Sequence, residues 1–189
     1  MDVKGKNIIV TGGSLGIGKE TAKSLVEKGA NVLITGRSEE RLQNAKLYTN
    51  ADILEFDIAD FDNLTQNAKK CLEILDNRVD VLINNAGIWV RASVEELNID
   101  DFLKVFNVNV FGLSLFTKEI IPLMKAKKSG TIINIGSTAS LKGYKNGSIY
   151  SSSKFAVRCL TQCWQAELRP FNIRVCQVNP SEVTTAFAN

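Results

Sequence analysis

The sequence predicts a doubly wound α/β domain, that is, a parallel β-sheet with helices on both faces. Three observations predict it. Short apolar runs alternate with longer amphipathic stretches from one end of the chain to the other. These runs are continuous rather than alternating between apolar and polar residues, as expected for strands that are covered on both faces. The chain of 189 residues is long enough to bury a core and is most simply one domain, residues 1–189.

The predicted elements follow one another in a strand–helix rhythm. The runs that predict strands are residues 7–13, 31–36, 51–57, 79–87, 130–137 and 173–180. The helix-length segments between them are residues 16–28, 38–48, 60–76, 98–127 and 149–168. Ser38 and Asp60 stand where two of these helices begin, and residues of this kind cap free backbone amides. Parallel strands joined by helices imply right-handed crossovers and a three-layer αβα sheet of the Rossmann type.

The two longest helices have apolar faces. In residues 98–127 the side chains expected to pack on the sheet are Phe102, Val105, Phe106, Leu113 and Phe116. In residues 149–168 the expected buried face consists of Phe155, Ala156, Cys159, Leu160 and Cys163. Ser148 is expected to cap this second helix. The chain stops just after the sixth strand, without a closing helix, so we expect a domain whose C-terminal part is missing.

Composition excludes several classes of function. A net charge of +3 with scattered lysines does not predict a nucleic-acid surface. No run approaches the roughly 20 apolar residues of a membrane span, and the N-terminus has no signal-peptide pattern. The four cysteines lack metal-like spacing and indicate reduced thiols, so we expect a cytoplasmic protein without a metal.

Histidine is absent from the sequence. Its absence excludes the Ser-His-Asp hydrolases, the Cys-His proteases and His-ligated zinc sites. Acid–base chemistry in this chain therefore has to come from Tyr, Lys, Asp, Glu or Cys.

The turn after the first predicted strand reads VTGGSLGIGKE and contains Gly12, Gly16 and Gly18. Their spacing, G-x-x-x-G-x-G, differs from the G-x-G-x-x-G dinucleotide fingerprint. Glycines at this junction let the backbone turn tightly and approach a pyrophosphate, which free N–H groups at a helix N-terminus would bind. The alternative is a glycine-rich turn without a ligand.

The stretch SIYSSSKFAVRCL places Tyr150 four residues before Lys154. Residues at i and i+4 share a helix face, so the ammonium can lie near the phenol. At about 4 Å and an effective dielectric constant of about 20 the interaction is worth about 4 kcal/mol. This predicts a phenol pKa lowered from about 10 toward working pH. The other interpretation is the ordinary polar start of a helix.

Four motifs occur in a characteristic order. They are Thr11-Gly12-x-x-x-Gly16-Ile17-Gly18, Asn84-Asn85-Ala86-Gly87 at the end of the fourth strand, Ser137, and Tyr150-x-x-x-Lys154. In this order the chain resembles the classical short-chain dehydrogenase/reductases from residue 5 to about residue 188. The resemblance implies an oxidoreductase that transfers a hydride between a nicotinamide and a carbonyl or secondary alcohol.

The resemblance also implies roles for individual residues. Tyr150 would be the general acid/base, Lys154 would tune it and bind the nicotinamide ribose, and Ser137 would orient the substrate. Asn109 would hold a water beside the lysine, although a structural asparagine is the alternative. A homodimer or homotetramer that pairs through residues 98–127 and 149–168 is implied as well.

Cofactor contacts are implied at several turns. In the glycine turn they fall on Thr11, Gly12, Ser14, Leu15, Gly16, Ile17 and Gly18. Elsewhere they fall on Arg37, Asp57, Asn85, Ala86, Gly87, Tyr150, Lys154, Pro180, Val183 and Thr185. Asp57 would contact the adenine or, alternatively, stabilise a turn before a helix. The paired asparagines can also brace the backbone between strands.

The end of the second strand favours NADP(H) over NAD(H). NAD-binding members usually carry an acid there that bonds the ribose 2′-hydroxyl, whereas this chain has Gly36 followed by Arg37. A guanidinium is a bidentate partner for a 2′-phosphate. Against this, Leu15 stands where some NADP enzymes have a base, and Arg37 could simply be solvated.

One position departs from the family pattern. The family usually reads Pro-Gly after the sixth strand, and here it reads Pro180-Ser181. A serine is disfavoured at that turn if its φ is positive.

The partner implied by the resemblance is a small-molecule carbonyl or alcohol. The alternative function is a dinucleotide-binding redox sensor that does not turn over.

Overall fold

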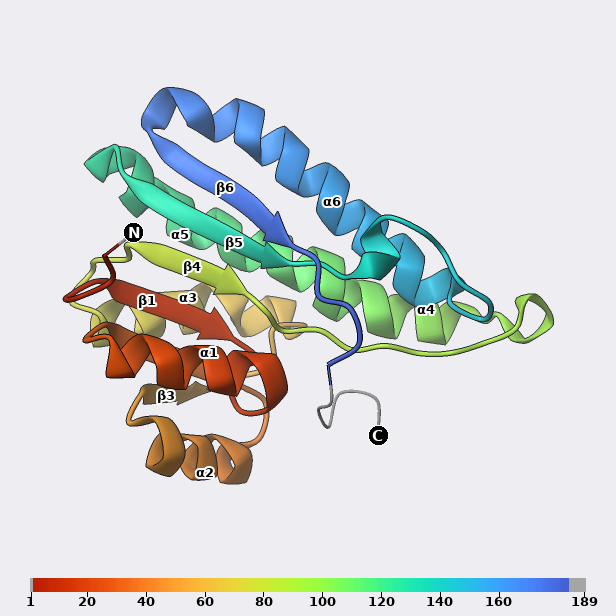
Figure 1. Cartoon of the computed structure of the whole chain (residues 1–189), viewed down its shortest axis with the longest axis horizontal. Helices are drawn as coiled ribbons and strands as arrows, with labels where there is room; N and C mark the ends of the chain where they lie inside the picture. Colours follow the sequence, from red (N-terminus) through yellow and green to blue (C-terminus); the bar gives the residue numbers. More distant parts are fainter. Residues whose placement is uncertain (1, 184–189) are drawn as a thin grey trace.

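The computed structural model describes residues 2–183 and contains one parallel sheet between two layers of helices (Figure 1). Within these residues the strands are β1 (Asn7–Thr11), β2 (Asn31–Gly36), β3 (Asp52–Glu55), β4 (Val81–Asn84), β5 (Gly130–Ile135) and β6 (Ile173–Val178). Their order is β3-β2-β1-β4-β5-β6, and every neighbouring pair is parallel. The predicted doubly wound αβα fold is confirmed. Most strands are shorter than predicted, because the residues past their carboxyl ends form loops.

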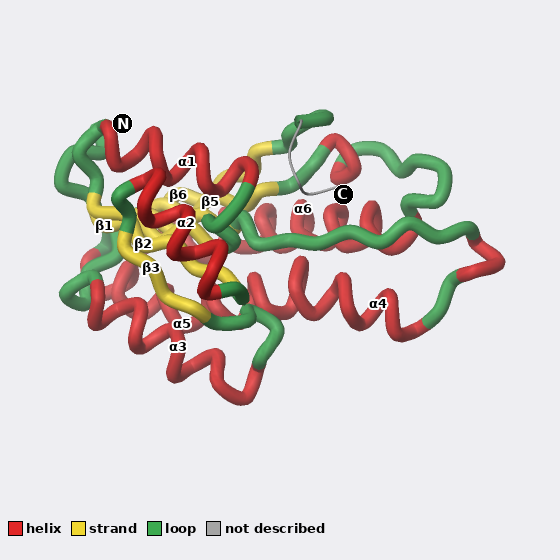
Figure 2. Tube along the Cα trace, turned by 90° about the horizontal axis from the view of Figure 1, so that it is seen from below, coloured by secondary structure: helices red, strands yellow, loops and turns green. Residues whose placement is uncertain are grey.

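Helices cover both faces of this sheet (Figure 2). They are α1 (Gly16–Glu27), α2 (Glu39–Thr49), α3 (Phe61–Ile74), α4 (Ile99–Phe106), α5 (Leu113–Lys127) and α6 (Ser148–Leu168). The shorter helical segments are η1 (Val94–Glu96), η2 (Asn107–Gly112), η3 (Thr138–Ser140) and η4 (Arg169–Phe171). Helices α1 and α2 lie on one face of the sheet, and α3 and α5 lie on the other. In the described part of the chain no helix is long and apolar enough to cross a membrane.

An apolar core lies on each face of the sheet, because neighbouring side chains of a strand point in opposite directions. Ile8 and Val10 of β1 pack with Leu42 of α2 in one core. Ile9, between them, packs with Phe116 of α5 in the other core. All three β1 side chains are fully buried, which explains why the strand reads as one continuous apolar run.

The predicted helix caps differ in outcome. The Ser38 hydroxyl accepts a hydrogen bond from the Arg41 amide at 3.4 Å, so this cap is confirmed. Asp60 stands at the N-cap position of α3, but its carboxylate accepts from the side-chain amide of Asn63 at 2.9 Å instead of from the backbone.

The prediction of one continuous helix over 98–127 is wrong. The segment consists of α4, the π-helical segment η2 and α5. At Gly112 the helix backbone touches the loop before α3, since a Cβ there would lie 2.5 Å from the Ile58 oxygen. Phe116 packs in the core beside the sheet as expected. Val105 and Phe102 instead pack with Ile149 of α6 in a separate small cluster.

The expected buried face of α6 is also wrong. Phe155, Cys159 and Cys163 are exposed rather than buried. The inward face holds apolar residues together with polar ones: Ile149, Ser151, Ser153, Lys154, Val157, Thr161 and Leu168. Ser148 does not cap the helix, because Gly147 occupies the N-cap position and Ser148 is the first helical residue.

Candidate active site

The predicted site residues meet at the edge of the sheet where the parallel strands end. Figure 1 shows the arrowheads of β1, β4, β5 and β6 pointing to this edge, with α1 beginning there and the first half of α6 running past it. In open α/β sheets the crevice outside the carboxyl ends, next to the strand where the order reverses, is the usual ligand site. Here the order reverses at β1, whose neighbours are β2 and β4.

The glycine turn between β1 and α1 is shaped for close backbone approach. Gly12 and Gly16 have φ of +64° and +53°, a region that residues with a Cβ rarely adopt. A Cβ on Gly18 would lie 2.5 Å from the Gly12 oxygen. The turn therefore requires glycine at all three predicted positions.

The N-terminus of α1 presents amides without a side-chain acceptor. Leu15 is the N-cap residue, makes no side-chain capping bond and is partly exposed, and the first turn carries no acid. By contrast, α2 is capped by Ser38 and has two glutamates in its first turn. An uncapped helix N-terminus beside a glycine turn fits a pyrophosphate, so the residues present fit a dinucleotide.

Thr11 and Asn85 tie the ends of β1 and β4 together. The Thr11 hydroxyl accepts from the amides of Asn85 and Ala86, both at 3.0 Å. The Asn85 side chain donates to the backbone carbonyl oxygens of Thr11 and Gly12 at 3.0 and 2.9 Å. Asn84 donates to Thr117 and Asn134. The predicted bracing role of the paired asparagines is thus confirmed.

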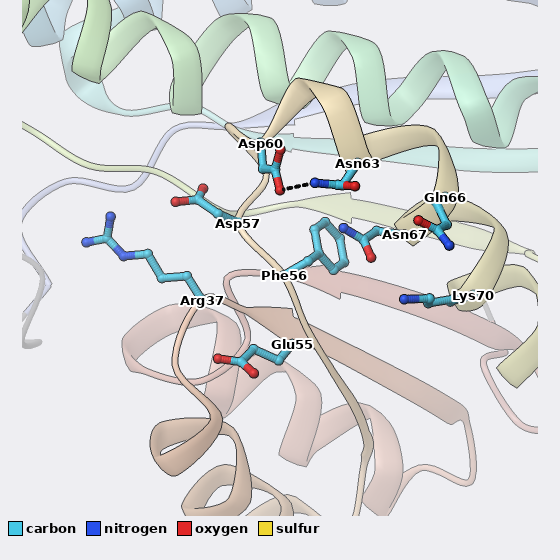
Figure 3. Close-up of a pocket in the computed structure, with 9 residues that line it drawn as sticks. All are labelled: Arg37, Glu55, Phe56, Asp57, Asp60, Asn63, Gln66, Asn67 and Lys70. Carbon is cyan, nitrogen blue, oxygen red and sulfur yellow. Dashed lines mark hydrogen bonds between the residues drawn. The ribbon is translucent and has the colours of Figure 1, made fainter.

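Arg37 and Asp57 line one cavity of about 440 Å³ at the ends of β2 and β3 (Figure 3). The Asp57 carboxylate accepts from the Ala59 amide at 2.9 Å, so it does stabilise the turn before α3. It lines the same cavity as Arg37, which leaves the adenine role open to it as well. Tyr150 is not among the residues that line this cavity.

Ser137 and Tyr150 form one polar contact across the end of β5. Ser137 follows β5 and is the N-cap of η3, and its hydroxyl accepts from the Ala139 amide at 3.1 Å. Burial raises the pKa of the Tyr150 phenol above its ordinary value, and a hydrogen bond with Ser137 lowers it in part. The expected net lowering of this pKa is wrong, because burial outweighs the hydrogen bond.

Lys154 is buried, and its ammonium donates to the Ile135 oxygen at 2.8 Å. Its Nζ atom lies 5.7 Å from the centre of the Tyr150 ring. Burial lowers the pKa of Lys154 to about 8. The lysine therefore lies on the tyrosine's side of α6 as predicted, although its own titration, rather than the phenol's, is displaced toward neutral pH.

The Asn109 side chain is fully buried and clamps the loop after β4. Its oxygen accepts from the Ile88 amide at 2.8 Å, and its nitrogen donates to the Ile88 oxygen at 2.9 Å. A Cβ on Gly87 would lie 3.4 Å from the Asn109 oxygen and 3.6 Å from the Lys154 nitrogen. These side chains thus converge on Gly87.

The residue that sequence reasoning missed is Ser153. Its hydroxyl donates to the backbone carbonyl oxygen of Tyr150, one turn earlier in α6, at 2.7 Å and accepts from the Asn109 side chain at 3.0 Å. It joins α6 to the π-helical segment. The signal was available, since Tyr150, Ser153 and Lys154 are at i, i+3 and i+4 and therefore share one helix face.

The last predicted contacts follow β6. The Pro180 oxygen accepts from the Thr138 amide at 3.0 Å, which holds this turn beside Ser137. Among the described residues, Ser181 does not have a positive φ. The serine that stands here in place of the family's usual glycine therefore causes no backbone strain. Val183 is half exposed, and Thr185 lies outside the described residues.

Comparison with known proteins agrees with this arrangement. The family described as short chain dehydrogenase matches residues 6–189. A trans-4-hydroxycyclohexanecarboxylate dehydrogenase of Sinomonas cyclohexanicum is 35% identical, over 95% of this chain and 73% of its own length. A Xenopus laevis protein named dehydrogenase/reductase SDR family member 7B is 33% identical over 94% of this chain. The chain spans only 58% of that relative's length.

A solved structure has the same fold. It is described as a short chain dehydrogenase/reductase family protein and superposes with a TM-score of 0.92 at 34% identity. The superposition covers 98% of this chain and 78% of the other.

Proposed function

We propose a function from one premise: the chain belongs to the short-chain dehydrogenase/reductase family. The function is that of an NADP(H)-dependent oxidoreductase that interconverts a carbonyl and a secondary alcohol, with Tyr150 as the general acid/base. The observation that carries it is the contact of Ser137 with the half-buried Tyr150, beside a buried Lys154. Residues 1–189 would belong to a single dinucleotide-binding catalytic domain.

Tyr150 supports the reductive direction best. A phenol whose pKa is raised by burial is protonated at neutral pH, so it can donate its proton to a carbonyl oxygen. Ser137 would donate a hydrogen bond to the same oxygen as negative charge develops on it. A nicotinamide bound at this edge would supply the hydride.

Lys154 and Asn109 would act behind the tyrosine. With a pKa of about 8 the lysine is mostly charged at pH 7 and remains able to exchange a proton. Its charge would favour the phenolate left after proton donation, and it would bind the nicotinamide ribose. Asn109 would hold the loop that carries Gly87 against this lysine and complete the proton relay.

The rest of the cofactor would lie along the glycine turn. The amides of α1 would bind the pyrophosphate, with Thr11, Gly12, Ser14, Leu15, Gly16, Ile17 and Gly18 lining the turn. The adenosine would occupy the cavity between Arg37 and Asp57, with Asn85 to Gly87 behind its ribose. Pro180, Val183 and Thr185 would flank the nicotinamide.

Arg37→Ala is expected to weaken NADPH binding by about 10-fold or more, because a charge-assisted hydrogen bond to phosphate is worth roughly 1.5–3 kcal/mol. NADH binding should change less than about twofold, since NADH has no 2′-phosphate. Isothermal titration of both cofactors measures the two constants. Arg41→Ala, one turn along α2, is the matched control, and equal losses for the two cofactors would contradict the assignment.

The protein is proposed to be a cytoplasmic homodimer or homotetramer. Supporting this, apolar side chains are exposed along the helices expected to pair; they are Ile99, Leu103, Phe111, Leu115 and Phe155. Contiguous exposed apolar surface is typical of interfaces. Sedimentation equilibrium should give two or four times the chain mass of 20.8 kDa, and a monomer at micromolar concentration would contradict the proposal.

The function itself is tested by NADPH oxidation over a set of ketones and 3-oxoacyl thioesters. Carbonyl-dependent oxidation is expected with at least one class. Tight NADPH binding without oxidation across the set would favour the sensor alternative.

A further inference from the structure

The end of β2 has glycine where NAD-binding members of the family usually carry an acid, but the neighbouring strand β3 carries an acid at the same level of the sheet. Gly36 ends β2, and its register partner on β3 is Glu55. Register partners in a parallel pair point to the same face and lie about 4.8 Å apart. Glu55 therefore projects on the face where a side chain at position 36 would project.

That face is the one turned toward the glycine turn. A Cβ on Gly36 would lie 3.3 Å from the Ser14 hydroxyl. An acid at position 36 would therefore stand beside the glycine turn, and Glu55 stands one strand further out. Arg37, Glu55 and Asp57 line the same cavity, and in Figure 3 the Arg37 side chain extends away from the Glu55 carboxylate.

The Glu55 carboxylate also occupies the N-terminus of α2. Its oxygen accepts from the Glu39 amide at 3.2 Å. The amides of a helix N-terminus favour an anion, and Arg37 lies one residue before the N-cap residue Ser38 of this helix. The Glu55 carboxylate thus adds a negative charge at the N-terminus of α2, close in sequence to Arg37.

We infer that Glu55 is a cofactor-selecting residue that opposes Arg37. Its charge disfavours the 2′-phosphate of NADP(H), and its carboxylate can accept a hydrogen bond from the 2′-hydroxyl of NAD(H). Arg37 thus favours NADP(H), and the opposite charge of Glu55 reduces that preference. This inference rests on the proposed function, because it concerns the adenosine end of the same site.

The variant Glu55→Gln removes the negative charge at position 55 and keeps the hydrogen bond that this side chain makes to α2. Glutamine keeps an oxygen that can accept from the Glu39 amide, so α2 retains its N-terminal bond. Asp52→Asn is the matched control, because Asp52 is an exposed acid at the other end of β3.

The probes are 2′,5′-ADP and 5′-AMP, followed by NADPH and NADH, each titrated by calorimetry. We expect Glu55→Gln to raise the preference for the 2′-phosphorylated ligand over its partner by about three- to tenfold in low salt. The gain should shrink at 0.3 M salt, because an exposed charge is screened. Asp52→Asn should change the preference by less than about 1.5-fold.

The outcomes are distinct. Cofactor binding with unchanged preference in Glu55→Gln, or an equal change in Asp52→Asn, overturns the inference and leaves the proposed function intact. A gain that persists at 0.3 M salt overturns the charge argument. Failure of wild type to bind either dinucleotide overturns the inference and the proposed function together.

Discussion

Tyr150→Phe is expected to lower kcat for carbonyl reduction by about 10²- to 10⁴-fold, the usual contribution of a positioned general acid. Phenylalanine keeps the half-buried ring but removes the proton and the hydrogen bond with Ser137. The dissociation constant for NADPH should change much less than kcat. Steady-state kinetics combined with cofactor titration separates the two quantities.

Tyr48→Phe is the matched control for that loss. Tyr48 is on α2, where its hydroxyl donates to Glu20 at 3.1 Å, far along the chain from α6. This variant should keep wild-type kcat. If Tyr150→Phe also kept it, Tyr150 would not be the proton donor.

Lys154→Met is expected to abolish most turnover while making the fold more stable at pH 7. Burial lowers the lysine pKa from 10.5 to about 8, which corresponds to about 3 kcal/mol of unfavourable charge burial. Methionine removes this cost and loses the hydrogen bond to the Ile135 oxygen, worth about 1 kcal/mol. The net gain in the free energy of unfolding should be about 1–3 kcal/mol.

The gain from Lys154→Met should depend on pH. Below pH 8 the lysine is charged in both the folded and the unfolded chain, so the whole cost of burial is present. Between pH 8 and 10.5 the folded chain releases the proton first, and wild type therefore gains stability. Urea unfolding at pH 7 and pH 10 should show a smaller difference between variant and wild type at pH 10.

Lys69→Met is the control, because Lys69 is exposed on α3 and a surface change of this kind is worth less than about 0.5 kcal/mol. A Lys154→Met variant less stable than wild type at pH 7 would contradict the assigned cost of burial.

The pattern of apolar residues was sufficient to predict the strands of the sheet. The centre of β1 is apolar without interruption because both faces of the sheet are covered there, as at Ile8 to Val10, and that pattern depends on the segment alone. The glycine turn was predictable for the same reason, since the positive φ at Gly12 and Gly16 is a local property.

Patterning failed on α6 because its inward face is partly polar. The apolar stripe through Phe155, Cys159 and Cys163 was the natural choice for a core, yet these residues are exposed. Ser153 and Thr161 face inward instead, because partners on other elements satisfy their hydroxyls. Such partners are distant in sequence, so hydrophobicity within the segment cannot reveal them.

The π-helical interruption between α4 and α5 could not be predicted from hydrophobicity within the segment either. Local propensity favours an α-helix across residues 98–127, and the π-helical turn places Asn109 against Ile88 and Gly112 against Ile58. Turns of this kind occur often at functional sites, where tertiary contacts support them. Asn109 and Gly112 inside a predicted helix were the available signals.

Transfer of deuterium from NADPH labelled at both C4 positions tests the central claim most directly. The labelled cofactor would be incubated with the ketone and thioester set, and the alcohols analysed by mass spectrometry. We expect deuterium on the carbinol carbon with wild type and Tyr48→Phe, and a loss of at least about 100-fold with Tyr150→Phe. Tight binding of NADPH without deuterium in any product, or undiminished transfer by Tyr150→Phe, would contradict the account.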